Sequence, residues 1–262
     1  MAKASAHPSS EFVKVLYVGA SGSGKTGSLV SLLKAGYKVY VLDLDNGLDA
    51  LIQAVKETCP EKLDDLDFLT YRDKMKADPM KGARVSGPAR AYTNAIKAME
   101  KWDDGSDPAE WGPQCVFVLD SLTLFGRAAF NWAVGLNPEC KDPRQWYATA
   151  QESLLKVLDL LTSAEFKTNV IVMTHIDVVE EKDGNIRAFA SSIGKALGPK
   201  IPAVFNTMIM AESRGTGDNV RRTVTTAPTS LINLKNPKPN AISKSMPFDT
   251  ALATIFKELT SK

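Results

Sequence analysis

The chain is poor in the residues that build metal centres and disulfide frameworks. It holds three cysteines and two histidines in 262 residues. Cys59, Cys115 and Cys140 are too few and too far apart in the sequence for a disulfide framework or a zinc ribbon. Two histidines exclude a histidine-rich metal site. We therefore expect a protein of the reduced, cytosolic type.

Long apolar runs are also missing from the sequence. No stretch approaches the roughly 18 continuous apolar residues that a membrane-spanning helix needs. The opening residues, MAKASAHPSSEF, lack the apolar centre of a secretory signal. From these two absences we expect a cytoplasmic protein that makes no contact with a membrane.

Neither sign of charge dominates the composition. The 32 basic and 30 acidic side chains give a formal net charge of +2, and 44% of the residues are hydrophobic. A disordered chain combines low hydrophobicity with strong net charge, so that class is excluded. A protein with basic residues over its whole surface is excluded as well, because it would carry a high positive net charge. The basic residues collect instead in four segments, at 72–90, 141–144, 182–200 and 235–244.

Apolar runs and helical spacing alternate along the chain in the order of an α/β protein. A strand at 12–18, a glycine-rich loop, a helix at 26–35 and a strand at 38–43 begin a parallel sheet. Further strands are expected at 66–71, 115–119, 169–174, 205–211 and 220–226. Further helices are expected at 48–57, 89–102, 122–134, 145–163, 194–204 and 248–260.

Two segments interrupt this alternation. Residues 72–88 are polar and basic among Gly and Pro, which predicts a mobile surface loop. Residues 177–190 predict a hairpin that turns at Asp183-Gly184. No internal repeat divides the chain, so we expect one core domain. The expected parts are a flexible N-terminal segment, a core, and a basic loop with a closing helix packed on that core, at 1–11, 12–227 and 228–262.

Residues 19–26, GASGSGKT, match the phosphate-loop pattern G-x-x-x-x-G-K-[ST] at every position. Glycine permits the positive φ angles that turn successive backbone N–H groups toward a phosphate. Lys25 can reach the β- and γ-phosphates, and the Thr26 hydroxyl can bind Mg²⁺. The sequence therefore predicts a site for ATP and Mg²⁺, lined by Gly19, Ser21, Gly22, Ser23, Gly24, Lys25, Thr26 and Gly27.

Residues 116–121, VFVLDS, form an apolar strand that ends in a carboxylate. In P-loop proteins such a Walker B strand places one acid beside the phosphate loop, where it holds Mg²⁺. Asp120 is therefore the second candidate metal ligand, together with Thr26. ATP hydrolysis also needs a carboxylate that orients or deprotonates the attacking water. Because Ser121 follows Asp120, we expect that base elsewhere, and the end of the second strand offers Asp43, Asp45 and Asp49.

Three segments together resemble the RecA/RadA recombinase core. They are VLDLDNGLD at 41–49, the strand that ends in Asp120-Ser121, and VIVMTH at 170–175. The resemblance implies a RecA-like P-loop NTPase fold, an α/β protein with a mostly parallel central sheet flanked by helices and antiparallel strands toward the C-terminal side. It implies Asp45 as the catalytic base, an Asp of shorter reach where the family has Glu. It also implies that His175 senses the γ-phosphate, where the family usually has Gln.

The same resemblance implies a channel for single-stranded DNA. The family lines this channel with the loops after the Walker B helix and after the sensor strand, which correspond here to 134–147 and 178–195. Basic groups neutralise phosphates and aromatic rings stack on unpaired bases, although an aromatic residue equally suits the core. The candidate DNA-binding residues are Lys141, Arg144, Trp146, Lys182, Arg187, Phe189 and Lys195.

Basic residues near the C-terminus are similar to the elements with which RecA-type ATPases reach the nucleotide of a neighbouring subunit. Lys235 or Lys238 would be such a trans-acting residue, and the Arg221-Arg222 pair is a second candidate. A solvated basic loop is the alternative interpretation. The resemblance thus implies a homo-oligomer, a filament or a ring, with nucleotide between its subunits.

The compact size is most similar to bacteriophage RecA-like single-strand annealing and recombination proteins, which would place the chain in the host cell cytoplasm. We therefore expect an ATPase with the catalytic residues Lys25, Asp45, Asp120 and His175. It would bind single-stranded DNA and promote annealing or homologous recombination, with DNA-stimulated ATP hydrolysis and a single-strand-binding protein as a further partner. Two alternatives stay open: a P-loop nucleotide or small-molecule kinase, and an annealing module in which ATP is only structural.

Overall fold

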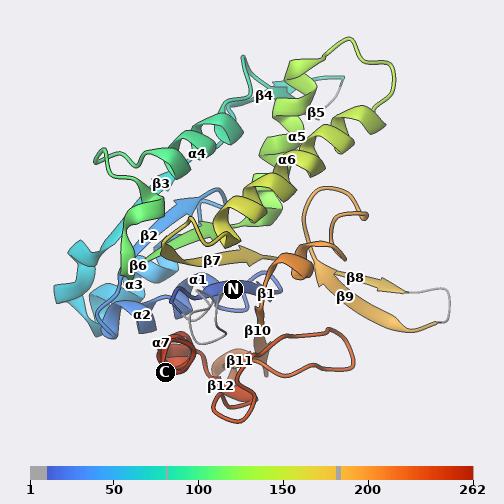
Figure 1. Ribbon diagram of the computed structural model, residues 1–262. Helices are drawn as coiled ribbons and strands as arrows, with labels where there is room; N and C mark the ends of the chain where they lie inside the picture. Colours follow the sequence, from blue (N-terminus) through green and yellow to red (C-terminus); the bar gives the residue numbers. More distant parts are fainter. Residues whose placement is uncertain (1–10, 81, 181–183, 262) are drawn as a thin grey trace, which may run out of the picture.

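The computed structural model describes residues 11–80, 82–180 and 184–261. Its centre is an eight-stranded sheet (Figure 1) built from β1 (Lys14–Gly19), β2 (Lys38–Asp43), β3 (Leu66–Thr70), β6 (Gly112–Asp120), β7 (Thr168–Thr174), β10 (Thr207–Arg214), β11 (Arg221–Thr225) and β12 (Ser245–Pro247). The strand order is β12-β11-β10-β1-β7-β6-β2-β3. From β10 to β3 all neighbours are parallel, whereas β11 and β12 are antiparallel. The predicted fold class is confirmed.

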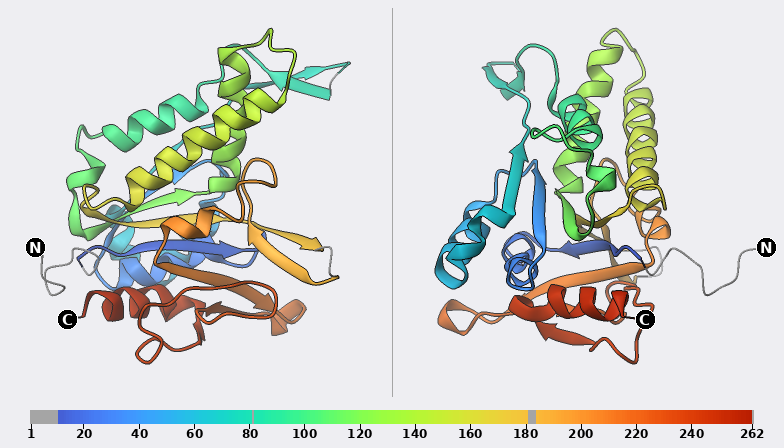
Figure 2. Two further views of the ribbon diagram at one scale, coloured as in Figure 1. Left: turned by 45° about the vertical axis from the view of Figure 1, so that its right-hand side comes forward. Right: turned by 60° about the vertical axis from the view of Figure 1, so that its left-hand side comes forward.

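Helices cover both faces of this sheet (Figures 1 and 2). One face carries α1 (Lys25–Ser28), α2 (Val30–Lys34), α3 (Asp49–Thr58) and α7 (Phe248–Thr260). The other carries α4 (Ala91–Glu100), α5 (Leu122–Leu136) and α6 (Arg144–Thr162). Short 3-10 helices join these elements at η3 (Pro60–Asp65), η4 (Pro108–Glu110), η5 (Ile201–Val204) and η6 (Gly217–Asn219).

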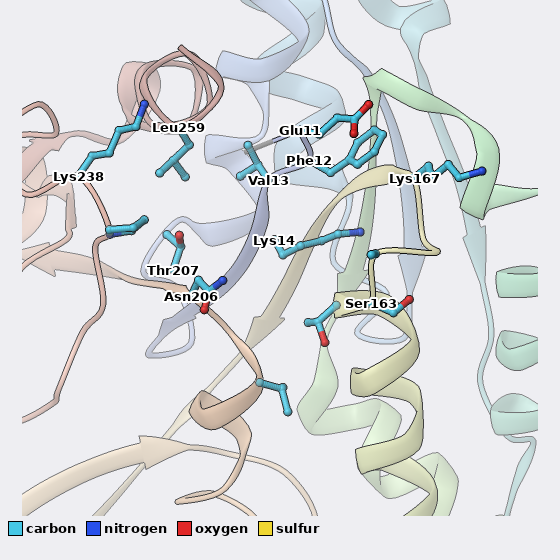
Figure 3. A pocket seen from close by; sticks show the side chains of 14 residues that line it. Glu11, Phe12, Val13, Lys14, Ser163, Lys167, Asn206, Thr207, Lys238 and Leu259 are labelled. Atoms are coloured by element: carbon cyan, nitrogen blue, oxygen red, sulfur yellow. The ribbon is translucent and has the colours of Figure 1, made fainter. Parts of the chain in front are cut away.

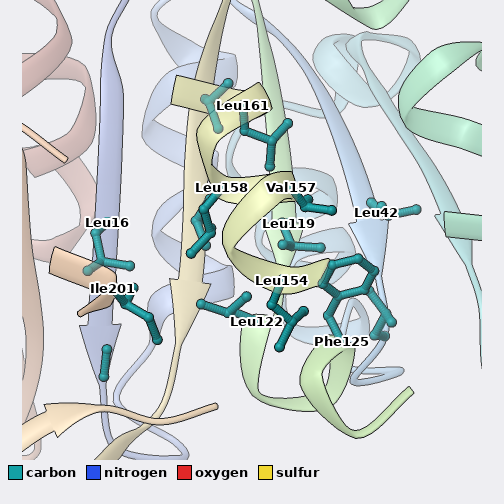
Figure 4. Close-up of a cluster of buried hydrophobic side chains, with 14 of the residues drawn as sticks. Leu16, Leu42, Leu119, Leu122, Phe125, Leu154, Val157, Leu158, Leu161 and Ile201 are labelled. Carbon is teal, nitrogen blue, oxygen red and sulfur yellow. The ribbon is translucent and has the colours of Figure 1, made fainter. Parts of the chain in front are cut away.

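The two-sided burial follows from the period of two along each strand. In β1, Val15 and Tyr17 pack with α1, α2 and α7, whereas Leu16 and Val18 pack with α5 and α6. All four side chains are fully buried. Figure 4 shows the cluster of buried side chains on the side of α5 and α6, in which Leu154 and its neighbours on α6 lie over the strands. Strands buried on both faces read as continuous apolar runs, which is why the sequence showed them clearly.

The predicted surface loop at 72–88 is wrong, because this segment forms a hairpin. Strands β4 (Met75–Asp78) and β5 (Gly82–Val85) pair antiparallel in a two-stranded sheet of their own. Asp78 and Gly82 are register partners, and the Arg84 Nε lies 3.3 Å from the Asp78 carboxylate. The polar composition indicated exposure correctly, but cross-strand pairing leaves little trace in composition.

The predicted helix at 194–204 is also wrong. The segment forms turns and ends in the single 3-10 turn η5. Pro199 and Pro202 each remove a backbone donor and clash with a preceding carbonyl, so an α-helix cannot continue through them. The predicted helix at 26–35 is interrupted at Leu29, which separates α1 from α2.

The C-terminal half contains the predicted hairpin, in which β8 (Ile176–Glu180) pairs antiparallel with β9 (Ile186–Ala190). Of its predicted turn, Asp183 lies outside the described residues. So does the predicted flexible segment 1–11, apart from residue 11.

Helix α7 packs through Leu252, Ile255 and Phe256 against α1 and α2. Every helix in the described part of the chain is too short or too polar to cross a membrane.

Candidate functional site

The carboxyl ends of four neighbouring parallel strands meet at one edge of the sheet. Strand β1 ends at Gly19, β2 at Asp43, β6 at Asp120 and β7 at Thr174. Because these strands are adjacent in the order β1-β7-β6-β2, the residues that follow them gather at one place. Open α/β sheets bind ligands at this edge. All four predicted catalytic residues lie here.

The phosphate loop connects β1 to α1. Gly22 has φ 75° and Gly24 has φ 95°, both in the left-handed region where a side chain would be strained. Ser23 is 3% exposed, and its hydroxyl has no hydrogen-bond partner among the described residues. A buried polar group without a partner is costly unless a ligand satisfies it. The loop therefore has both the backbone shape and a spare hydroxyl for a phosphate group.

Lys25 is folded back over this loop. Its Nζ donates to the Gly19 carbonyl at 2.8 Å and to the Ala20 carbonyl at 3.1 Å. Burial lowers the pKa of its ammonium group, and the carboxylates of Asp120 and Asp45 oppose that shift. A bound triphosphate would supply the negative charge that the two carbonyls only partly provide.

Asp120 and Thr26 form the pair expected to hold Mg²⁺. The Thr26 Oγ1 donates to the Asp120 Oδ2 at 2.6 Å. Burial raises the pKa of the Asp120 carboxyl to about 6, with the Thr26 hydrogen bond opposing the shift. The described residues contain no group of three or more His, Cys, Asp or Glu suited to a metal ion. Two oxygen ligands fit Mg²⁺, which usually takes one or two protein ligands and completes its shell with phosphates and water.

Asp45 lies beside this pair, held by the residue that follows Asp120. Its Oδ1 accepts hydrogen bonds from the Ser121 backbone N–H at 3.2 Å and from the Ser121 hydroxyl at 2.7 Å. Its Oδ2 lies 4.0 Å from the His175 Nε2. Asp43, which the sequence offered as an alternative base, is 2% exposed and accepts instead from Asp45 N, Asn46 N and Thr70 Oγ1. The geometry favours Asp45 over Asp43.

His175 lies near both the Asp45 carboxylate and the Lys25 ammonium group. Burial lowers the pKa of its imidazole, the nearby Lys25 ammonium lowers it further, and Asp45 and Asp177 raise it. The imidazole is therefore neutral near pH 7 and can both donate and accept a hydrogen bond.

Behind His175 lies a polar network that the sequence did not reveal. The His175 backbone N–H donates to the Thr123 Oγ1 at 3.0 Å, and the Thr123 and Thr174 hydroxyls lie 3.0 Å apart. Both hydroxyls reach the Ser191 carbonyl at the end of β9. The Ser191 N–H donates in turn to the His175 carbonyl at 2.8 Å. Two threonines at strand and helix ends show no spacing signature, so only the tertiary structure identifies them.

The predicted DNA-binding residues are placed unevenly. Lys141, Arg144, Arg187 and Lys195 are exposed, and Lys182 lies outside the described residues. The Arg144 guanidinium forms a bidentate ion pair with the Asp142 carboxylate, donating from Nε to Oδ1 and from Nη2 to Oδ2, each at 2.9 Å.

The two aromatic candidates have structural contacts. The Trp146 Nε1 donates to the Asn137 carbonyl at 2.9 Å, and its ring packs edge-on against Phe130. Phe189 is half-buried in β9. The two predicted loops do meet, because Gly194 lies against Tyr147, and Gln151 further along α6 donates to the Ile193 carbonyl.

The two candidate trans-acting lysines are engaged by their own chain. The Lys235 Nζ donates to the Pro202 and Phe205 carbonyls at 2.5 and 3.1 Å. The Lys238 Nζ donates to the Glu258 and Ser261 carbonyls at the end of α7. In the subunit described, each ammonium group therefore tethers one backbone segment to another, and a trans-acting role for Lys235 or Lys238 stays a prediction.

A separate cavity of about 690 Å³ lies at the amino ends of β1, β7 and β10 (Figure 3). Lys14, Thr207, Lys238 and Leu259 are among the residues that line it. It lies at the opposite edge of the sheet from the phosphate loop. Of the predicted site residues, only Lys238 lines it, so it is not part of the nucleotide site.

Comparison with known proteins places this site in a family. The AAA domain family AAA_24 matches residues 11–237. A search of curated proteins found no match. Among solved structures, a KaiC-like protein from the archaeon Pyrococcus horikoshii is 14% identical, with a TM-score of 0.41, over 82% of this chain and 79% of its own.

Two further solved structures are similar at the same level. The flagellar accessory protein FlaH from Methanocaldococcus jannaschii is 12% identical, with a TM-score of 0.43, over 90% of this chain and 84% of its own. An ATPase of the type III secretion system of pathogenic bacteria is 14% identical, with a TM-score of 0.44, over 77% of this chain and 51% of its own. With its phosphate loop and Walker B strand inside the matched region, the chain belongs to the AAA domain family and carries a RecA-like P-loop ATPase core.

Proposed function

We propose that this chain binds single-stranded DNA in an ATP-dependent manner and promotes strand annealing or homologous recombination, with DNA-stimulated ATP hydrolysis. One observation carries the proposal. The candidate γ-phosphate sensor His175 is joined by the Thr123, Thr174 and Ser191 hydrogen bonds to both segments that are expected to contact DNA. Thr123 begins the helix that leads to 134–147, and Ser191 ends the hairpin within 178–195.

In the nucleotide site, each residue has a distinct role. Lys25, the orphaned Ser23 hydroxyl and the loop backbone hold the triphosphate, and Thr26 with Asp120 holds Mg²⁺. Asp45 orients or deprotonates the attacking water, because Ser121 fixes one carboxylate oxygen and leaves the other without a hydrogen bond from the described residues. The charge that develops on the phosphates is stabilised by Lys25 and the metal.

Coupling to DNA follows from the position of His175. A neutral imidazole that hydrogen-bonds a γ-phosphate loses this partner after hydrolysis. The backbone of His175 is hydrogen-bonded directly to Thr123 and Ser191. A small displacement of His175 would therefore move the start of α5 and the base of β8–β9 together. The exposed cations of the two segments, such as Lys141, Lys195 and Arg187, would neutralise DNA phosphates.

The proposal includes a homo-oligomer, a filament or a ring, with nucleotide at the interface of two subunits. The nucleotide edge of the sheet is open enough for such contact, since Asp45 and His175 are both partly exposed. A single-strand-binding protein is proposed as a further partner, and the cytoplasm of a bacteriophage host as the place of action.

The test is steady-state phosphate release from MgATP with and without single-stranded DNA, run beside Lys25→Ala and Asp45→Ala. We expect DNA to stimulate release by the wild type, and both variants to lose that activity. DNA affinity should also fall steeply with salt concentration.

Three results would contradict the proposal. Stimulation by nucleosides instead of DNA would identify a kinase. Full annealing by Asp45→Ala would show that ATP is only structural. DNA binding that depends on neither ATP nor salt would exclude the ATP-dependent, charge-driven binding proposed here.

A further inference from the structure

Strand β11 brings an arginine onto the phosphate loop. Gly19 at the end of β1 is the register partner of Ala211 on β10, and two residues further along β10, Ser213 is the partner of Arg222 on β11. Strand β11 therefore extends past the end of β1, to the level of the loop that follows it. A Cβ atom added to Gly24 would lie 2.7 Å from the Arg222 Cδ and 3.4 Å from its Nε. The stem of Arg222 thus packs directly against the residue that precedes Lys25.

Arg222 is exposed, and its guanidinium has no hydrogen bond or ion pair with any described residue. A nearby arginine does find an acidic partner, because Arg214 on β10 pairs with the Glu212 carboxylate at 3.2 Å. The Glu212 carboxylate is also taken by the Thr225 hydroxyl. Unlike Arg214, Arg222 keeps its guanidinium without a partner among the described residues, beside a loop whose glycines suit an anion.

We propose that Arg222 contacts the phosphate chain of the nucleotide bound to its own subunit. This inference rests on the proposed nucleotide site and adds a residue to it. Guanidinium is permanently charged, and its fork of N–H donors matches the spacing of phosphate oxygens. Lys235 and Lys238 are engaged elsewhere in the chain, so β11 supplies the second cation of the site. The side chain stands over the loop of its own subunit, which makes the contact one in cis.

The strand provides a matched control. Arg221 is also exposed and differs from Arg222 by one position, so its side chain leaves the opposite face of β11. Arg222 shares its face with Val224, which packs in the same cluster as the α1 and α2 residues that follow the loop. Neither arginine contributes to the core, so both alanine variants are expected to fold, and thermal melting checks this.

The first experiment measures binding of fluorescent ATP and ADP analogues with Mg²⁺ to the wild type, Arg222→Ala, Arg222→Lys and Arg221→Ala. Loss of charge-assisted hydrogen bonds predicts a reduction of ATP affinity of about 10- to 100-fold for Arg222→Ala. Arg222→Lys should recover part of the loss, and Arg221→Ala should bind like the wild type. Equal affinity of Arg222→Ala and Arg221→Ala overturns the inference. If the wild type itself binds no MgATP, the proposed function fails as well.

The second experiment separates a cis from a trans role. Arg222→Ala and Lys25→Ala subunits are mixed, and phosphate release is measured. If Arg222 acts in cis, each subunit lacks a component of its own site, so the mixture releases no more phosphate than the two variants measured separately. Activity restored by mixing would show that a Lys25→Ala neighbour lends its Arg222, and the cis assignment would be wrong.

Discussion

Two lysines at opposite edges of the sheet have nearly the same immediate contacts and different surroundings. Lys25 donates to the Gly19 and Ala20 carbonyls, and Lys14 donates to the Phe166 and Thr168 carbonyls at 2.6 and 2.8 Å. Burial lowers the pKa of both ammonium groups, that of Lys14 to about 7.

What differs is the second layer around each lysine. Lys25 is surrounded by Asp120, Asp45 and a loop with an unsatisfied hydroxyl. Lys14 lies 4.8 Å from the centre of the Phe166 ring and has no ion pair with a described carboxylate. A buried ammonium group therefore does not by itself mark a catalytic site. The acids and the left-handed glycines around it do, and Lys14 is interpreted as a tie between the starts of β1 and β7.

The largest expected difference between the two edges is in ATP turnover. Lys25→Ala should reduce phosphate release by about a thousandfold, because the charge that stabilises the transferred phosphoryl group is lost. Lys14→Met should leave turnover within about twofold of the wild type, since its ammonium group ties backbone carbonyls only. Phosphate release at saturating MgATP measures both. A large loss of phosphate release in Lys14→Met would show that Lys14 also contributes to turnover, and the contrast between the two lysines would be wrong.

A second contrast concerns two acids near the end of β2. Asp45→Asn should lower turnover by about a hundredfold while ATP affinity stays nearly constant, because a general base is lost and the triphosphate contacts are not. Asp49→Asn, at the exposed start of α3, is the matched control and should change neither quantity. Equal turnover in the two variants would remove Asp45 from the mechanism.

The Asp120 carboxylate should give turnover an acid limb. Its pKa in the metal-free protein is raised to about 6, and the protonated form cannot hold Mg²⁺, so at limiting Mg²⁺ turnover should fall about tenfold for each pH unit below that value. Stability follows the same titration. Between pH 3.8 and about 6 the folded protein binds more protons than the unfolded chain, so the metal-free protein should lose stability as pH rises. Urea unfolding of the wild type against Asp120→Asn, which cannot titrate, isolates this contribution.

The last expected effect, also on stability, has the opposite sign and comes from the amino ends of the strands. Lys14 has a pKa lowered from 10.5 to about 7, so between these values the unfolded chain binds more protons than the folded one. The stability of the wild type relative to Lys14→Met should therefore rise as pH increases from 7 toward 10. Urea unfolding at several pH values measures the difference. A constant difference across this range would show that burial does not shift the Lys14 titration.

Much of the fold was readable from the sequence. Strands β1, β6 and β7 are buried on both faces over most of their length, so they appear as continuous apolar runs, and the carboxyl ends of these adjacent runs carry Gly19, Asp120 and Thr174. The sequence did not predict the hairpin at 72–88, and the helix that it predicted at 194–204 does not form. The first depends on pairing between exposed strands, and the second on two prolines whose effect outweighs the helical spacing around them.

By itself, the sequence determined the sheet, the phosphate loop and the acids at the strand ends, because these depend on local spacing and on a strict motif. Only the tertiary structure showed that Ser121 fixes Asp45, that Thr123 links His175 to Ser191, and that Arg222 lies on the loop. It also showed that Lys235 and Lys238 bind carbonyls of their own chain. Such contacts join residues far apart in the chain, so they follow from strand order and register, which a pattern of neighbouring residues does not contain.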